Sequence, residues 1–109
     1  MGDKAKDKKI SAAVDAYANC DIMRLELDGR ATELHYLQGN LLDRIEHARR
    51  NNDATELVFM KKLSDFVARE ANRIDALDSR LAVMQSELFE ELDELFDGAL
   101  TADKQNKPA

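Results

Sequence analysis

The sequence predicts an all-α protein that folds as an elongated antiparallel two-helix hairpin with coiled-coil-like packing. Its composition is typical of long helices, with many Leu, Ala, Glu, Asp, Arg and Lys but only 4 Gly and 1 Pro. Apolar residues also recur at alternating spacings of three and four through both halves of the chain, which is the pattern of helices packed along a seam. The 109 residues suffice for one domain.

The first helix is predicted over about residues 10–50. Its seam positions are Ile10, Ala13, Tyr17, Cys20, Arg24, Leu27, Ala31, Leu34, Gln38, Leu41, Ile45 and Ala48. Ten of these twelve residues are apolar and the spacing never slips, so we expect them to face a partner helix. The apolar surface is widened by the flanking residues Val14, Met23, Leu37 and Leu42.

The second helix is predicted over about residues 54–98. Its expected seam positions are Met60, Leu63, Val67, Glu70, Ile74, Leu77, Leu81, Met84, Leu88, Glu91 and Leu95. Nine of these eleven are apolar. The flanking apolar residues here are Leu57, Phe66, Ala71 and Leu92.

The break between the helices is predicted at Arg50-Asn51-Asn52-Asp53. Asn51 and Asn52 tolerate turn geometry, and Asp53 with Glu56 resembles a capping box in which Asp replaces the usual Ser or Thr. A short link makes the two helices antiparallel neighbours. At 1.5 Å per residue, a helix of about 45 residues would be roughly 68 Å long.

Two local signals oppose a single long first helix. Asp28-Gly29 ends an alternating segment and is a β-hairpin signal, but no further strand is predicted to stabilise a hairpin there. Gly39-Asn40 offers a stop and a cap, which would give three helices at about 10–38, 41–50 and 54–98. Because the seam stays in phase across both places, we favour one helix, continuous or kinked near Gly39.

The polar ends of the chain are expected to be disordered. Residues 1–9 are rich in lysine, and residues 101–109 are polar and contain the one proline. The helical-hairpin domain is therefore predicted to cover residues 10–100.

Charge and cysteine content narrow the functional classes. The chain has 22 acidic and 16 basic residues, and this balance argues against non-specific binding of nucleic acid or membrane surfaces. No apolar run approaches the roughly 20 residues of a membrane helix. Cys20 is the only cysteine, so no disulfide can form within the chain, which favours a reducing compartment such as the cytoplasm.

The sequence contains no recognisable catalytic or metal-binding pattern. His35 and His47 lack the carboxylate spacing of a helical metal site, and the glycines are isolated rather than arranged in a phosphate-binding loop. Cys20 falls on the apolar seam, where a buried thiol is inert. We therefore expect a protein that is not an enzyme and that has no cofactor or metal.

Two surfaces point instead to protein binding. A second regular stripe lies opposite the seam of the first helix and comprises Ala18, Ile22, Leu25, Gly29, Thr32 and Tyr36. A lone hairpin buries only one seam, so we expect this outer stripe to complete a four-helix bundle, by dimerisation or by binding a partner.

The second surface is the acidic segment 87–97, in which Phe89, Leu92 and Phe96 are predicted to share one helix face. Aromatic residues ringed by charge are typical of an interaction hot spot. Alternatively, the hairpin brings an N-terminal lysine cluster beside these acids. Its members are Lys4, Lys6, Lys8 and Lys9.

Small acidic helical hairpins with a polar tail at each end resemble, as a class, secretion chaperones and assembly adaptors. We therefore expect an adaptor or chaperone that packs a basic or amphipathic helix of a partner protein, as a homodimer or in a heterocomplex. The expected partner-binding residues are Ile22, Leu25, Tyr36, Phe89, Leu92 and Phe96.

Three alternatives stay open. The chain could be a structural subunit of a viral or secretion assembly, or an acidic regulator that mimics nucleic acid. It could also be a small RNA-binding hairpin dimer. That last alternative would use the basic residues near the turn, namely Arg44, Arg49, Arg50, Lys61 and Lys62, although acidic residues interleave with them.

Overall fold

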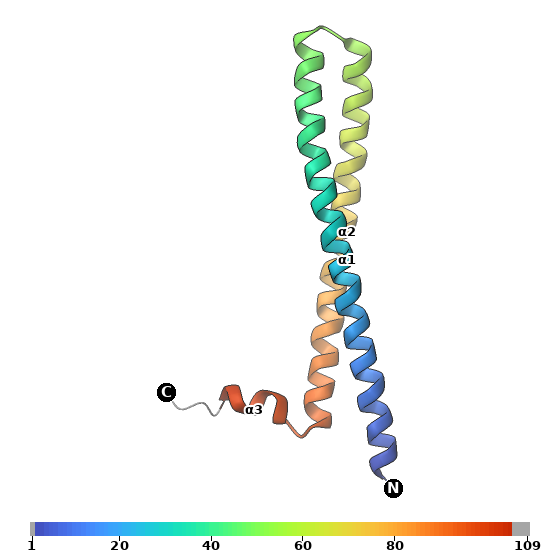
Figure 1. Ribbon diagram of the computed structural model, residues 1–109, viewed down its shortest axis with the longest axis vertical. Coiled ribbons are helices and arrows are strands. Elements are labelled where there is room, and N and C mark those ends of the chain that lie inside the picture. Colours follow the sequence, from blue (N-terminus) through green and yellow to red (C-terminus); the bar gives the residue numbers. More distant parts are fainter. Residues whose placement is uncertain (1, 106–109) are drawn as a thin grey trace. The chain divides into compact units, whose positions relative to one another are not determined.

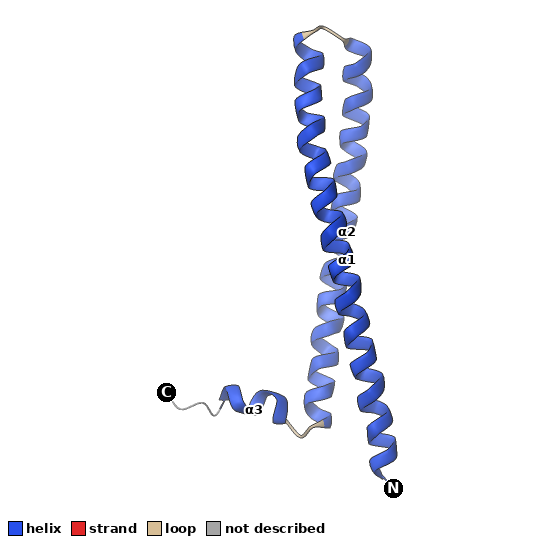
Figure 2. Ribbon diagram, in the orientation of Figure 1, coloured by secondary structure: helices blue, strands red, loops and turns tan. Residues whose placement is uncertain are grey.

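The computed structural model describes residues 2–105 as three helices (Figure 1). They are α1 (Gly2–Arg50), α2 (Ala54–Leu95) and the short α3 (Ala99–Gln105). Within these residues there is no strand (Figure 2), so the prediction of an all-α helical hairpin is confirmed. None of the three helices combines the length and the apolar character needed to cross a membrane.

The chain forms two compact units, each built from a segment of α1 and a segment of α2. One unit contains residues 25–79, with the turn between the helices, and we call it the turn unit. Among the described residues, the other contains 2–24 and 80–105, including α3, and we call it the terminal unit.

Helix α1 runs without interruption through Gly29 and Gly39. The alternative with three helices broken near Gly39 is therefore wrong, and so is the β-hairpin at Asp28-Gly29. A glycine inside a helix costs only about 1 kcal/mol relative to alanine, which packing of an unbroken seam readily offsets.

The turn after α1 is a Schellman motif. Asn52 takes the left-handed conformation, with φ of 52°, and its N–H donates to the carbonyl oxygen of Arg49 at 3.2 Å. The N–H of Asp53 donates to the carbonyl oxygen of Ala48 at 2.9 Å. These two bonds satisfy carbonyls at the end of α1, and asparagine fits because it tolerates positive φ better than most residues.

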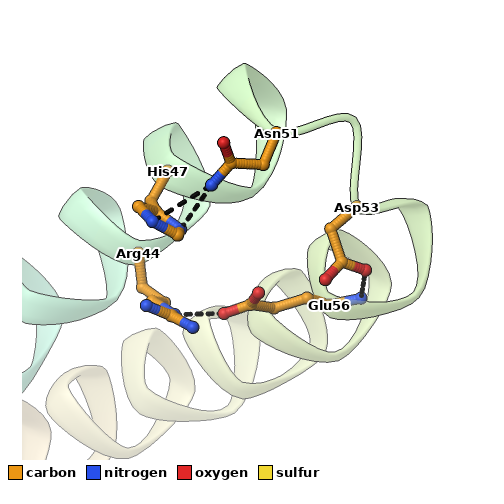
Figure 3. Close-up of polar contacts among 5 residues, drawn as sticks. All are labelled: Arg44, His47, Asn51, Asp53 and Glu56. Atoms are coloured by element: carbon orange, nitrogen blue, oxygen red, sulfur yellow. Dashed lines mark hydrogen bonds and ion pairs between the residues drawn. The ribbon is translucent and has the colours of Figure 1, made fainter.

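Asp53 then caps α2, as Figure 3 shows. Its Oδ1 accepts a hydrogen bond from the N–H of Glu56 at 3.0 Å, which is one half of the predicted capping box. The other half is absent, because the Asp53 N–H is bonded to α1 and the Glu56 carboxylate pairs with Arg44 instead. This ion pair joins α1 to α2 beside the turn.

The seam of α1 matches its prediction. All twelve predicted positions from Ile10 to Ala48 are buried or half-buried. They include Cys20, a buried free thiol. The core contributed by α1 therefore follows directly from the spacing of apolar residues.

The seam of α2 is rotated from the predicted one. Alternate predicted positions are buried or half-buried, namely Met60, Val67, Ile74, Leu81, Leu88 and Leu95. Of the positions between them, Glu70 is also half-buried, but four are exposed and their prediction is wrong, namely Leu63, Leu77, Met84 and Glu91. The hairpin instead buries or half-buries the residues one place later than Leu63, Glu70, Leu77, Met84 and Glu91, namely Ser64, Ala71, Asp78, Gln85 and Leu92. The apolar surface of α2 is wider than one helix can cover, so only one of its two edges packs against α1.

In the terminal unit, α1 and α2 meet through an aromatic pair and a polar layer. The rings of Tyr17 and Phe89 lie 6.5 Å apart. Gln85 is buried, accepts a hydrogen bond from Arg24 at 3.0 Å and donates one to Asp21 at 3.4 Å. A buried polar layer of this kind fixes the register of the two helices, because a shifted register would leave its groups unbonded.

Both predicted tails differ from the structure where it describes them. Residues 2–9 continue α1, with Asp3 in its first turn complementing the helix dipole. Residues 99–105 form α3, whereas residues 106–109 lie outside the described part of the chain. Local hydrogen bonding explains α3: the Asp93 carboxylate accepts from the N–H groups of Leu100 and Thr101, at 3.0 and 3.2 Å.

Helix α2 ends three residues before its predicted end. A second Schellman motif closes it, with Asp97 at φ of 56° and the N–H of Gly98 bonded to the carbonyl oxygen of Asp93 at 2.7 Å. Phe96 consequently lies in the turn between α2 and α3, not in a helix.

Candidate partner-binding surfaces

A shallow hollow lies on one side of α1 in the turn unit. It is lined by Ala31, Thr32, His35, Tyr36, Gly39, Asn40, Leu42 and Asp43, all of them from α1. Gly39 leaves the hollow open, since a Cβ added there would meet no atom within 4 Å. We call this feature the α1 hollow.

Two large apolar side chains border the α1 hollow. Tyr36 is 77% exposed and Leu42 is 61% exposed. A knob from a facing helix packs into a gap between side chains of this kind, and a glycine deepens that gap. The hollow can therefore receive one apolar side chain between two apolar walls.

The predicted outer stripe of α1 is exposed. Leu25 and Tyr36 in the turn unit are exposed, and so is Ile22 in the terminal unit. The structure thus leaves these three predicted residues uncovered, and Tyr36 also belongs to the α1 hollow.

Helix α2 presents an apolar stripe that the sequence assigned in part to the core. Phe59, Leu63, Phe66 and Leu77, all in the turn unit, are exposed by 41–61%. Their spacing places them within about 60° of one another around the helix axis. We call these four residues the α2 stripe.

A groove between α1 and α2 opens beside the α2 stripe. It is lined by Arg30, Glu33, Leu34, Phe66, Glu70 and Ile74. Glu70 and Arg73 form an ion pair at 2.9 Å on the exposed side of α2, between Phe66 and Leu77. Apolar side chains on this face therefore flank one acidic and one basic residue.

The predicted face at the acidic end of α2 is only partly present. Leu92 is 7% exposed, so it belongs to the core of the terminal unit, and the expectation that it binds a partner beside Phe89 and Phe96 needs correction. Phe89 is half-exposed and packs toward Tyr17, whereas Phe96 lies in the turn after α2. The physical reason is the rotated seam, which turns position 92 toward α1.

The terminal unit contains a cluster of lysines and a cluster of acidic residues. Among the side chains that the structure describes, no ion pair within 4.0 Å joins the N-terminal lysines to the acids of residues 87–97. Over the described residues, no group of three or more His, Cys, Asp and Glu side chains could hold a metal ion.

Comparison of the chain with protein-family models, with curated proteins and with solved structures found no match.

Sequence reasoning missed the exposed apolar side chain of Phe59. Phe59 precedes Leu63 and Phe66 by four and seven residues, a spacing that places all three on one helix face. That signal shows an apolar surface wider than one seam. The interpretation of Gly39 as a helix breaker leaves out that a glycine in an intact helix opens a gap for a neighbouring side chain.

Proposed function

We propose that this protein is a helical adaptor or chaperone, which binds an amphipathic helix of another protein against α1. The observation that supports the proposal is the α1 hollow, in which an open glycine lies between an exposed tyrosine and an exposed leucine. Binding of this kind completes a bundle of helices and buries apolar surface that the hairpin leaves in water.

The mechanism is knobs-into-holes packing. An apolar side chain of the partner enters the hollow above Gly39, and Tyr36 and Leu42 close around it. Leu25 extends the apolar contact toward the N-terminus of the turn unit. Tyrosine suits this role because it supplies a large contact area with little loss of side-chain entropy.

The partner is proposed to be basic or amphipathic. The chain has a formal net charge of -6, which favours encounter with a basic surface. The proposal places the protein in a reducing compartment such as the cytoplasm, because Cys20 is buried and has no second cysteine to pair with.

Substitution of Gly39 by leucine tests the proposal. Leucine fills the hollow, and leucine has a higher helix propensity than glycine, so the fold is retained while the partner is excluded. We expect Gly39→Leu to melt at or above the wild-type temperature and to weaken partner binding by at least about tenfold, the loss expected when one interface anchor is removed.

Ser79→Leu is the matched control, since it adds the same side chain at an exposed position of α2. Wild-type, Gly39→Leu and Ser79→Leu proteins are immobilised and exposed to lysate of the native host, and bound proteins are quantified by mass spectrometry. The enriched partner is then titrated against all three. Equal affinity of that partner for wild-type and Gly39→Leu proteins would show that the α1 hollow is not its binding site.

A further inference from the structure

We infer that the α2 stripe is the interface between two copies of this chain, which pack antiparallel with Glu70 of each copy opposite Arg73 of the other. This inference concerns a different face from the α1 hollow and does not depend on the proposed adaptor function. It assigns a second copy of the chain, rather than another protein, to the apolar surface of α2.

The α2 stripe is an apolar surface that the chain itself leaves uncovered. Phe59, Leu63, Phe66 and Leu77 are all exposed, and the groove beside them exposes part of the boundary between α1 and α2. Phe66 alone is 51% exposed. Aromatic and aliphatic side chains concentrated on one helix face mark an interaction surface.

The order of apolar and charged residues on this face of α2 favours a second copy of the chain as the partner. Phe66, Glu70, Arg73 and Leu77 follow one another at spacings of four, three and four. Read in the opposite direction, the order is again apolar, charged, charged and apolar, but with the basic residue before the acidic one. Two copies in antiparallel alignment therefore place Glu70 of each copy opposite Arg73 of the other.

The geometry of the helix makes this alignment symmetric. If a two-fold axis crosses α2 midway between Glu70 and Arg73, each of them lies about 2 Å along the helix from that axis at 1.5 Å per residue. Glu70 is then level with Arg73 of the second copy, and Phe66 is level with Leu77 of the second copy. One patch that contacts itself about a two-fold axis is the usual arrangement of a homodimer.

The charges of this patch are accessible for such pairing. The Glu70 and Arg73 side chains are 31% and 72% exposed, and they already form an ion pair within one chain. In the dimer, the two pairs join into a network of four charges, in which each carboxylate has a guanidinium on either side. Charge order of this kind selects the register and orientation of helices that share an apolar interface.

The test uses charge reversal at these two positions, with the full chain and sedimentation equilibrium as the measurement. Glu70→Arg places four basic residues at the axis, and Arg73→Glu places four acidic residues there. Each single variant should therefore dimerise at least about tenfold more weakly than wild type, since like charges across an interface are strongly unfavourable.

Two rescue experiments should restore the dimer. The double variant with both Glu70→Arg and Arg73→Glu again places each acid opposite a base. An equimolar mixture of the two single variants should form a heterodimer, because one chain then supplies only bases and the other only acids. Circular dichroism checks that every variant retains its helices.

The mixture separates the dimer interface from a purely intrachain role. If Glu70 and Arg73 only stabilise α2, the double variant recovers but the mixture does not, and the inference is overturned. Glu46→Arg is the matched control, because it breaks the exposed ion pair between Glu46 and Arg50 on α1 and should leave dimerisation unchanged.

Two further outcomes would also overturn the inference. If the wild-type chain stays monomeric at every concentration, the α2 stripe does not bind a second copy, and its partner is a different protein. The other outcome is dimerisation that is unchanged by Glu70→Arg and Arg73→Glu but lost in an Ile22→Asp, Leu25→Asp variant. That result would place the interface on the outer stripe of α1.

Discussion

Single residues with positive φ close the C-terminal ends of α1 and α2. Asn52 and Asp97 occupy equivalent places in two Schellman motifs, and Gly98 follows with φ of 79°. A side chain in the left-handed region costs about 1–2 kcal/mol, although less for Asn and Asp than for other residues. Both positions hold a residue, asparagine or aspartate, that adopts positive φ at a lower energetic cost. Each helix therefore ends at a defined residue.

Glycine has opposite consequences at Gly29 and Gly98, and this difference gives a prediction. Gly29→Ala should raise the free energy of unfolding by about 0.5–1 kcal/mol, because it removes backbone entropy from the unfolded chain and meets no neighbouring atom. Gly98→Ala should lower it, since alanine is strained at φ of +79°. Urea denaturation of both variants measures the two changes, and a loss of stability in Gly29→Ala would contradict helical geometry at that position.

At the scale of the helices, the rotated seam of α2 decides which apolar residues stabilise the fold. Val67 is 1% exposed, whereas Val58 on the same helix is 53% exposed. The same side chain therefore has different surroundings at two places only nine residues apart.

Val67→Ala should cost about 1.5–3 kcal/mol of unfolding free energy, through two lost buried carbon groups and the cavity that they leave. Val58→Ala should change it by less than about 0.5 kcal/mol, because the side chain is half in water and alanine favours helix. Chemical denaturation compares the pair directly. Equal effects at both positions would contradict the burial pattern that distinguishes the two faces of α2.

At the scale of the whole molecule, basic and acidic residues cluster near opposite ends of the sequence. Lysines cluster in residues 4–9, and acids cluster in residues 87–97. Because no described ion pair joins the clusters, any attraction between them acts through solvent and is weakened by salt.

Deletion of residues 1–9 should therefore change the melting temperature by less than about 2 °C, as expected when only exposed side chains are lost. The side chains of residues 3–9 are all exposed, which is the basis of this expectation. Thermal melts in low and in high salt test it. A large loss of stability that appears only in low salt would show instead that the lysines neutralise the acidic end of α2.

The two proposed interfaces also belong to this scale, since they use different faces of the molecule. The α1 hollow is formed by α1 alone, and the α2 stripe lies on the other helix. A dimer through the α2 stripe would leave the hollow of each copy open to a partner helix.

The sequence by itself determined the two long helices, the turn between them and the seam of α1. Each depends on local information: the three-four spacing from Ile10 to Ala48, the Asn-Asn turn and the cap at Asp53. Exposure of Ile22, Leu25 and Tyr36 also follows from that spacing, because the side of a helix opposite its seam faces away from the neighbouring helix.

Only the tertiary structure decided which edge of α2 packs against α1. The apolar surface of α2 includes residues 63, 77 and 84 as well as 67, 74 and 81, and periodicity alone gives no preference between two adjacent edges of one broad stripe. The edge that packs against α1 carries Ser64, Ala71, Gln85 and Leu92, which are buried or half-buried, and Gln85 accepts a hydrogen bond from Arg24 of α1. That selection buried Leu92 and left Leu63, Phe66 and Leu77 in solvent, because a single neighbouring helix covers only part of so wide a surface.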